Sequence, residues 1–157
     1  MSTSATVLVR SALLEDLPIL LRFEQGVIEA ERPFDSTLKD QARYYNLEEL
    51  ITAPHIEMAV AERNGEIMGC GYARIEDAKS YSKHKKHAYL GFMFVDSKYR
   101  GQGLNKKIIN HLKAWIYSKG IDELRLEVYV ENESAIKAYQ KMGFSSLLYE
   151  MRMSLKE

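Results

Sequence analysis

The chain has 157 residues, of which 46% are hydrophobic and 28% charged, a composition typical of a globular protein with a buried core. Basic and acidic residues number 22 each, and the resulting formal net charge of +0 argues against a protein that mainly binds nucleic acid or an anionic membrane. A single cysteine, Cys70, excludes an intramolecular disulfide and a cysteine-based metal cage. We expect one domain over residues 1–157.

The sequence also favours a cytoplasmic protein without a membrane partner. No apolar run approaches the ~20 residues that a membrane helix needs. Residues 1–10 lack the basic stretch and apolar region of a secretory signal.

The first half of the chain predicts a strand, two helices and then an antiparallel meander. Asn64-Gly65 is a strong hairpin signal between two of the meander strands. The predicted elements are a strand at 6–10, a helix at 14–31 that breaks at 31–35, a shorter helical stretch within 38–51, and strands at 56–62, 66–75 and 88–95.

The second half begins with the clearest helix, 103–119, and Gly120 follows it as a C′ glycine would. A strand at 123–130, a short helix at 134–142 and a strand-rich segment at 144–155 complete the order. The helix at 103–119 carries its apolar residues at helical spacing: Leu104, Ile108, Ile109, Leu112, Trp115 and Ile116.

The segment 95–106 carries the first chemical signal, because a strand ends, a glycine-rich turn follows and an amphipathic helix begins. Gly101 and Gly103 let the backbone approach a ligand closely. The free N–H groups at the start of the helix, together with its dipole, favour an anion. Arg100, Lys106 and Lys107 add positive charge. The turn therefore predicts a phosphate or pyrophosphate site, with an ordinary strand-to-helix turn as the alternative. It matches neither a P-loop nor a dinucleotide fingerprint.

The segment 127–144 carries the second signal, in which a strand leads to a helix capped by Asn or Ser, with Asn132 and Ser134 as the residues available. Tyr139 lies four residues after Ala135 and so shares its helix face, while Gly143 ends the helix and Phe144 starts the next segment.

With both segments in the right order, the chain resembles the GNAT superfamily of N-acetyltransferases. That family carries Arg/Gln-x-x-Gly-x-Gly/Ala at its central helix, here Arg100, Gly103 and Asn105. It also carries Asn-x-x-Ala-x-x-x-Tyr-x-x-x-Gly-Phe in its last helix, which this chain matches throughout. The resemblance implies an α/β (α+β) fold with a mixed, mostly antiparallel central sheet, splayed between its fourth and fifth strands and flanked by helices on both faces.

The resemblance further implies transfer of an acetyl group from acetyl-CoA to a primary amine by direct attack in a ternary complex. For the pantetheine arm, the resemblance implies backbone groups of Met93, Phe94 and Val95, with Asn132 and Ala135 near the pantetheine amides. For the pyrophosphate, it implies the turn that comprises Arg100, Gly101, Gln102, Gly103, Leu104, Asn105 and Lys106. Tyr139 is the implied general acid, because a phenol can protonate the departing thiolate.

Two departures from the family pattern leave alternatives open. Asn105 stands where the family has Gly or Ala, and its amide either crowds the phosphates or donates to them. The strand 89–95 has no carboxylate to act as base, so Glu127 on the neighbouring strand is the candidate, with a water chain as the alternative. A catalytically silent CoA-binding sensor or partner-binding module is the competing function, and a longer acyl-CoA donor is also open.

The acceptor, a small-molecule amine or a peptide or protein amine, is expected near the link at 29–35, and the family's habit makes a homodimer an expectation. We predict no metal, because His84 and His87 lack acidic or cysteine neighbours in the sequence. Cys70, between two glycines, is expected to be a small buried hydrophobe.

Overall fold

The structure, a computed structural model, describes residues 6–156. Residues 1–5, half of the segment expected to lack a signal sequence, lie outside the described part. The chain forms two compact units, whose boundary in the sequence lies between Glu127 and Val128. That the whole chain acts as one domain stays a prediction.

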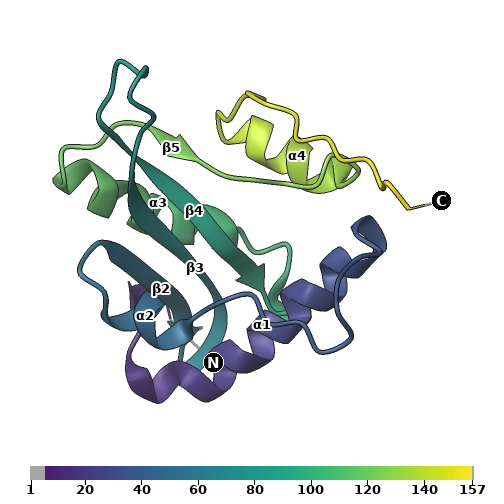
Figure 1. The fold of residues 1–157 in the computed structure, drawn as a ribbon. Coiled ribbons are helices and arrows are strands. Elements are labelled where there is room, and N and C mark those ends of the chain that lie inside the picture. Colours follow the sequence, from purple (N-terminus) through teal and green to yellow (C-terminus); the bar gives the residue numbers. More distant parts are fainter. Residues whose placement is uncertain (1–5, 157) are drawn as a thin grey trace. The chain divides into compact units, whose positions relative to one another are not determined.

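The first unit contains five strands and the helices that cover them (Figure 1). No helix among residues 6–156 is both long enough and apolar enough to cross a membrane. In chain order the elements are β1 (Leu8–Ser11), η1 (Leu14–Asp16), α1 (Leu17–Glu31), η2 (Arg32–Phe34), α2 (Leu47–Thr52), β2 (Ile56–Arg63), β3 (Glu66–Asp77), β4 (Lys86–Val95), η3 (Ser97–Tyr99), α3 (Leu104–Ser118) and β5 (Leu124–Arg125).

The five strands form one sheet in the order β1-β2-β3-β4-β5, in which only the β4–β5 pair is parallel. That pair joins Ala88 to Leu124 and Tyr89 to Arg125, and β4 then continues to Val95 without β5 beside it. The predicted splay between the fourth and fifth strands is therefore confirmed. The strand expected at 123–130 is much shorter than predicted, because only two of its residues find a partner strand.

Helices cover both faces of the sheet, as predicted. On one face α1 and α2 pack over a core that includes Leu20, Phe23 and Phe92. On the other face α3 lies close to the strands, because Gly69 and Gly71 present no side chain and the methyl groups of Ile108 approach them. Cys70, between these glycines, points to the α1 face and is fully buried, which confirms its expected role and raises the pKa of its thiol.

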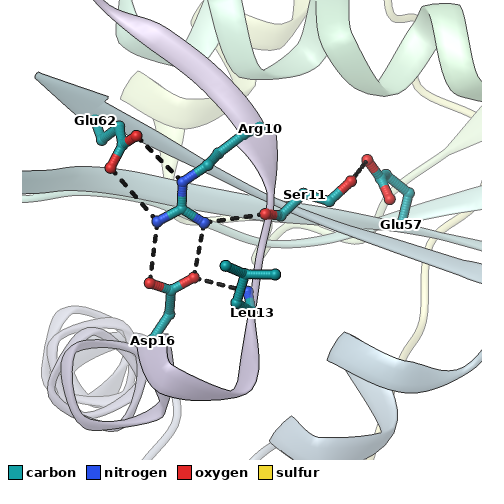
Figure 2. A network of polar contacts seen from close by, with 6 residues as sticks. All are labelled: Arg10, Ser11, Leu13, Asp16, Glu57 and Glu62. Carbon is teal, nitrogen blue, oxygen red and sulfur yellow. Dashed lines mark hydrogen bonds and ion pairs between the residues drawn. The ribbon is translucent and has the colours of Figure 1, made fainter. Parts of the chain in front are cut away.

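A polar network ties the first strand to its neighbour and to the start of α1 (Figure 2). Arg10 of β1 donates to both carboxylate oxygens of Asp16 at 2.9 and 3.1 Å and pairs with Glu62 of β2 at 3.3 Å. The Asp16 carboxylate, only 6% exposed, also accepts from the backbone N–H of Leu13 at 2.7 Å. The Arg10 guanidinium lowers the pKa of Asp16 and so favours its charged form.

The second unit contains α4 (Glu133–Lys141), and no described residue of it forms a strand. The expectation of a strand-rich segment at 144–155 is wrong for this structure. Its alternating apolar residues suit a strand, but a strand also needs a hydrogen-bonded neighbour, and residues 144–156 have none in the described sheet.

Candidate functional site

A β-bulge interrupts β4 at the start of the predicted pantetheine segment. Cys70 pairs with Phe94 and Tyr72 with Gly91, so Phe92 and Met93 together lie opposite the single residue Gly71. Phe92 accordingly has φ +51, a left-handed conformation that is rare for a bulky residue. The ring of Phe92 is buried and stacks on Tyr45 with 4.4 Å between centroids, which holds the bulge in place.

From the bulge onward, Met93 and Phe94 direct their side chains into the two opposite faces of the sheet. The Met93 sulfur lies over Gly71 on the α3 side, where any Cβ at Gly71 would collide with it. The Phe94 ring packs against Phe23 of α1 at 4.9 Å and fills the space left by Gly26. What β4 presents along its β5 side is therefore backbone, which an extended ligand can pair with as an added strand does.

The turn after β4 forms a hollow of about 230 Å³ at the start of α3. Gly101 and Gly103 adopt φ +81 and +75, and Gly103 is the N-cap of α3. The first N–H groups of this fifteen-residue helix have no partner within it, and its dipole adds partial positive charge. The lining residues are Val95, Tyr99, Arg100, Gly101, Gly103, Leu104 and Asn105. This geometry suits a phosphate group.

Asn105 lines this hollow, and its Oδ1 atom is buried without a hydrogen-bond partner. Leaving such an atom unpaired costs about 1–3 kcal/mol, so the side chain gains from a ligand or water that bonds to it. Arg100 is exposed, and its Nε donates to the Val95 carbonyl at 3.2 Å, which holds the guanidinium at the end of β4. Gln102 and Lys106 belong to the same turn but do not line the hollow.

Glu127, the predicted base, accepts a hydrogen bond from the hydroxyl of Tyr89 on β4 at 3.0 Å. Burial, followed by the nearby Glu127 charge, raises the pKa of Tyr89, so the phenol stays protonated and able to donate. Position 91 on β4 has no carboxylate for a physical reason: the Tyr72 ring occupies the place where a Cβ of Gly91 would be. At position 91, therefore, a carboxylate side chain would collide with the Tyr72 ring.

In the second unit, Asn132 caps α4, with its Oδ1 accepting from the Ala135 N–H at 3.3 Å. Tyr139 lies on the same helix, its ring edge-on to Phe144 with 5.7 Å between centroids. The Phe144 N–H donates to the Tyr139 carbonyl at 3.0 Å, and Gly143 between them has φ +108. The motif residues thus form a compact helix end, as its sequence pattern predicts.

Residues 29–35, the link expected near the acceptor, are anchored by ion pairs and hydrogen bonds. Arg32 donates to Glu29 and to the carbonyls of Lys39 and Asp40 at 2.8–2.9 Å. Burial raises the pKa of Glu31, which is half-buried at the end of α1. Fully buried Glu24 accepts from Arg43 at 2.8 Å and from two backbone N–H groups of the same segment.

Sequence reasoning found the glycine turn but missed the residues that support it. Glu24 fixes the segment that carries Tyr45, Tyr45 stacks on Phe92, and Phe92 makes the bulge. None of these residues is part of a recognisable sequence motif, because they contact one another from distant parts of the chain. The two neighbouring glycines at 69 and 71 were the only signal of close approach in this region.

Comparison with known proteins agrees with this geometry. The family model described as Acetyltransferase (GNAT) family matches residues 24–144. N-alpha-acetyltransferase 30 of Saccharomyces cerevisiae is 30% identical over 90 residues, covering 57% of this chain and 49% of that protein. Thialysine N-epsilon-acetyltransferase of Bos taurus is 38% identical over 69 residues, covering 43% and 41%. The chain thus spans about half the length, or less, of these curated relatives.

Among solved structures, the fold is similar to a predicted acetyltransferase with acetyl-CoA from Clostridium acetobutylicum. The TM-score is 0.73, and the match covers 96% of this chain and 97% of the other. At 15% sequence identity this likeness supports the fold alone.

Proposed function

Because the chain belongs to the Acetyltransferase (GNAT) family, we propose that it transfers an acetyl group from acetyl-CoA to a primary amine. The observation that carries the proposal is the glycine turn at the start of α3, which offers a phosphate-sized hollow beside exposed backbone N–H groups. The family match runs from residue 24 to 144 and so spans both units, which supports their acting as one domain.

The proposed cofactor contacts follow the chain from β4 into α3. The pantetheine arm pairs with backbone groups of Met93, Phe94 and Val95 on the edge of β4 that faces away from β3, where the pairing with β5 has ended. The pyrophosphate is held by the turn from Arg100 to Lys106, and the amide of Asn105 turns its NH₂ group toward a phosphate oxygen. In the second unit, Asn132 already uses its Oδ1 for the helix cap, so its amide NH₂ would meet the pantetheine carbonyl.

The proposed chemistry is direct attack by the amine nitrogen on the thioester carbonyl carbon. An ammonium cannot attack, so Glu127 accepts a proton from the acceptor first. The tetrahedral intermediate then expels CoA as a thiolate, and the Tyr139 hydroxyl donates the proton that makes it a thiol. The nitrogen loses its second proton to solvent, which leaves an amide and free CoA.

The acceptor is an amine on a small molecule or at a peptide or protein. The relatives support both classes, since one is named for N-alpha-acetylation and the other for thialysine N-epsilon-acetylation. The half-buried Glu31 would favour a cationic acceptor at the end of α1, where Glu29 is already paired with Arg32.

A release assay for free CoA thiol tests the proposal, with peptide N-termini, lysine, thialysine and simple diamines as acceptors. Tyr139→Phe is expected to lower turnover about a hundredfold, because it removes general acid catalysis, while the Kd for acetyl-CoA stays near the wild-type value. Tyr117→Phe on α3, 80% exposed, is the matched control and should behave as wild type.

Three outcomes separate the hypotheses. Full turnover in Tyr139→Phe would show that Tyr139 is not the acid. Tight acetyl-CoA binding with no thiol release from any amine would favour a catalytically silent sensor. Faster turnover with propionyl-CoA or succinyl-CoA would identify a longer acyl donor, and light scattering tests the expected homodimer.

A further inference from the structure

A group of metal-ligand side chains lies at the opposite end of β4 from the glycine turn. His84, His87 and Glu123 each place one ligand atom within 4.8 Å of the other two. His84 comes from the segment between β3 and β4, His87 from β4, and Glu123 from the residue before β5. We propose that these three side chains bind a divalent transition metal ion, with zinc as the favoured ion.

Strand register explains how the group assembles. Ala88 pairs with Leu124, and the Ala88 N–H donates to the Glu123 carbonyl at 2.9 Å, so His87 and Glu123 lie side by side at the start of the parallel pair. Glu76 of β3 is the register partner of His87 on its other side. Paired residues present their side chains on the same sheet face, which puts one histidine between two carboxylates.

Unused ligand atoms point to a missing partner. His87 is only 9% exposed, and its Nδ1 is buried with no hydrogen-bond partner. The Nε2 atom of His84 is also buried without a hydrogen bond, although it lies 3.4 Å from a Glu123 carboxylate oxygen. Leaving such nitrogens unpaired costs free energy. A metal ion in contact with both would satisfy them.

The spacing and the surroundings suit zinc. Tetrahedral ligands at the usual zinc distances lie about 3.3 Å apart, close to the separation of His84 and Glu123. The Nε2 atom of His87 lies 3.4 Å from Glu76, and a carboxylate on the far nitrogen of a metal-bound histidine orients the ring. With three protein ligands, water would occupy the fourth position.

Nearby positive charge weakens the site without blocking it. Arg125 donates to one oxygen of Glu123 at 2.6 Å, and Arg74 holds Glu76 at 2.9 Å. The oxygen that accepts from Arg125 is the same Glu123 Oε2 that lies 3.4 Å from His84, so an ion would share it with Arg125 or bind the second carboxylate oxygen. We therefore expect micromolar affinity, weaker than that of closed structural zinc sites.

The prediction of no metal rests on the neighbours of His84 and His87 along the chain alone. His84 and His87 have no acidic neighbour along the chain, but folding brings Glu123 beside them. The inference goes beyond acetyl transfer, since eight residues of β4 at ~3.3 Å each separate His87 from Val95 by roughly 25 Å. Such an ion would cross-link the segment between β3 and β4 to the start of β5.

Titration of tag-free full-length protein with ZnCl₂, in competition with a chromophoric chelator, tests the site. Wild type should bind one equivalent, and CoCl₂ should give the visible absorption of a low-coordinate site. His84→Asn and Glu123→Gln should each weaken zinc binding about tenfold or more, while His55→Asn, at an exposed histidine outside the group, should not. Zinc should also raise the melting temperature of wild type more than that of His84→Asn.

The proposal is overturned if wild type binds no zinc, if His55→Asn loses as much affinity as His84→Asn, or if MgCl₂ competes as well as ZnCl₂. The last result would indicate a diffuse acidic surface, because magnesium prefers oxygen ligands. If the acetyl-CoA affinity of His84→Asn equals that of wild type, a gain or loss of zinc binding bears on the metal site alone and not on the acetyltransferase proposal.

Discussion

Gly103→Ala separates the contribution of the glycine turn to stability from its proposed role as a phosphate site. Gly103 has φ +75, and a Cβ added there would meet no atom within 4 Å. The substitution therefore costs only the left-handed conformation, about 1–2 kcal/mol. For a chain of this size that corresponds to a fall in melting temperature of roughly 2–8 °C.

Gly120, just past the other end of α3, provides a matched control. It also has φ +75 and no atom within 4 Å of an added Cβ, so Gly120→Ala should lose the same stability. Only at Gly103 would the new methyl group stand where the proposed phosphate oxygens approach the helix N–H groups. We expect the acetyl-CoA Kd of Gly103→Ala to rise about tenfold or more, equivalent to ~1.4 kcal/mol, and that of Gly120→Ala to stay unchanged.

Isothermal titration calorimetry with acetyl-CoA and thermal unfolding of both variants give the two readouts. Equal losses of melting temperature with wild-type affinity in both variants would refute the assignment of this turn to the phosphates. Equal losses of affinity in both would mean that helix stability, rather than the approach to the backbone, governs binding.

Three further substitutions test the supporting structure. Asp16→Asn removes the charge that pairs with Arg10 and should lower the free energy of unfolding by about 2 kcal/mol at neutral pH. Because the pKa of Asp16 is lowered in the folded state, this contribution is present above the unfolded pKa near 3.9 and is lost as pH falls through the folded pKa. Urea unfolding should therefore show the stabilities of wild type and variant converging in acid. Glu24→Ala leaves two partly buried N–H groups and Arg43 without their acceptor and should cost about 2 kcal/mol, with loss of substrate turnover if the segment positions Tyr45. Unchanged unfolding would contradict the role given to Glu24. Gly71→Ala places a methyl group against Met93 and should lower the free energy of unfolding by about 1–3 kcal/mol. It should also weaken acetyl-CoA binding, because Met93 belongs to the bulge of β4. A variant that binds acetyl-CoA normally would show that the bulge tolerates repacking.

The sequence alone determined the features that depend on near neighbours. Asn64-Gly65 predicts a tight hairpin, and both residues adopt φ values of +55 and +76 as that turn requires. The apolar spacing of α3 and the glycine beyond its end predict the helix and its limits. The two motifs identify the family, because their chemistry lies in short continuous segments.

Only the tertiary structure decided the features that depend on pairing between distant segments. The bulge at Phe92 exists because two residues of β4 face one residue of β3, which no local pattern encodes. The segment 144–155 has a strand's alternation but no partner strand in the described sheet, so its prediction failed. Glu123 meets His87 through parallel pairing of strands that α3 separates along the chain. Local propensity fixes each segment's shape, whereas register fixes which side chains meet.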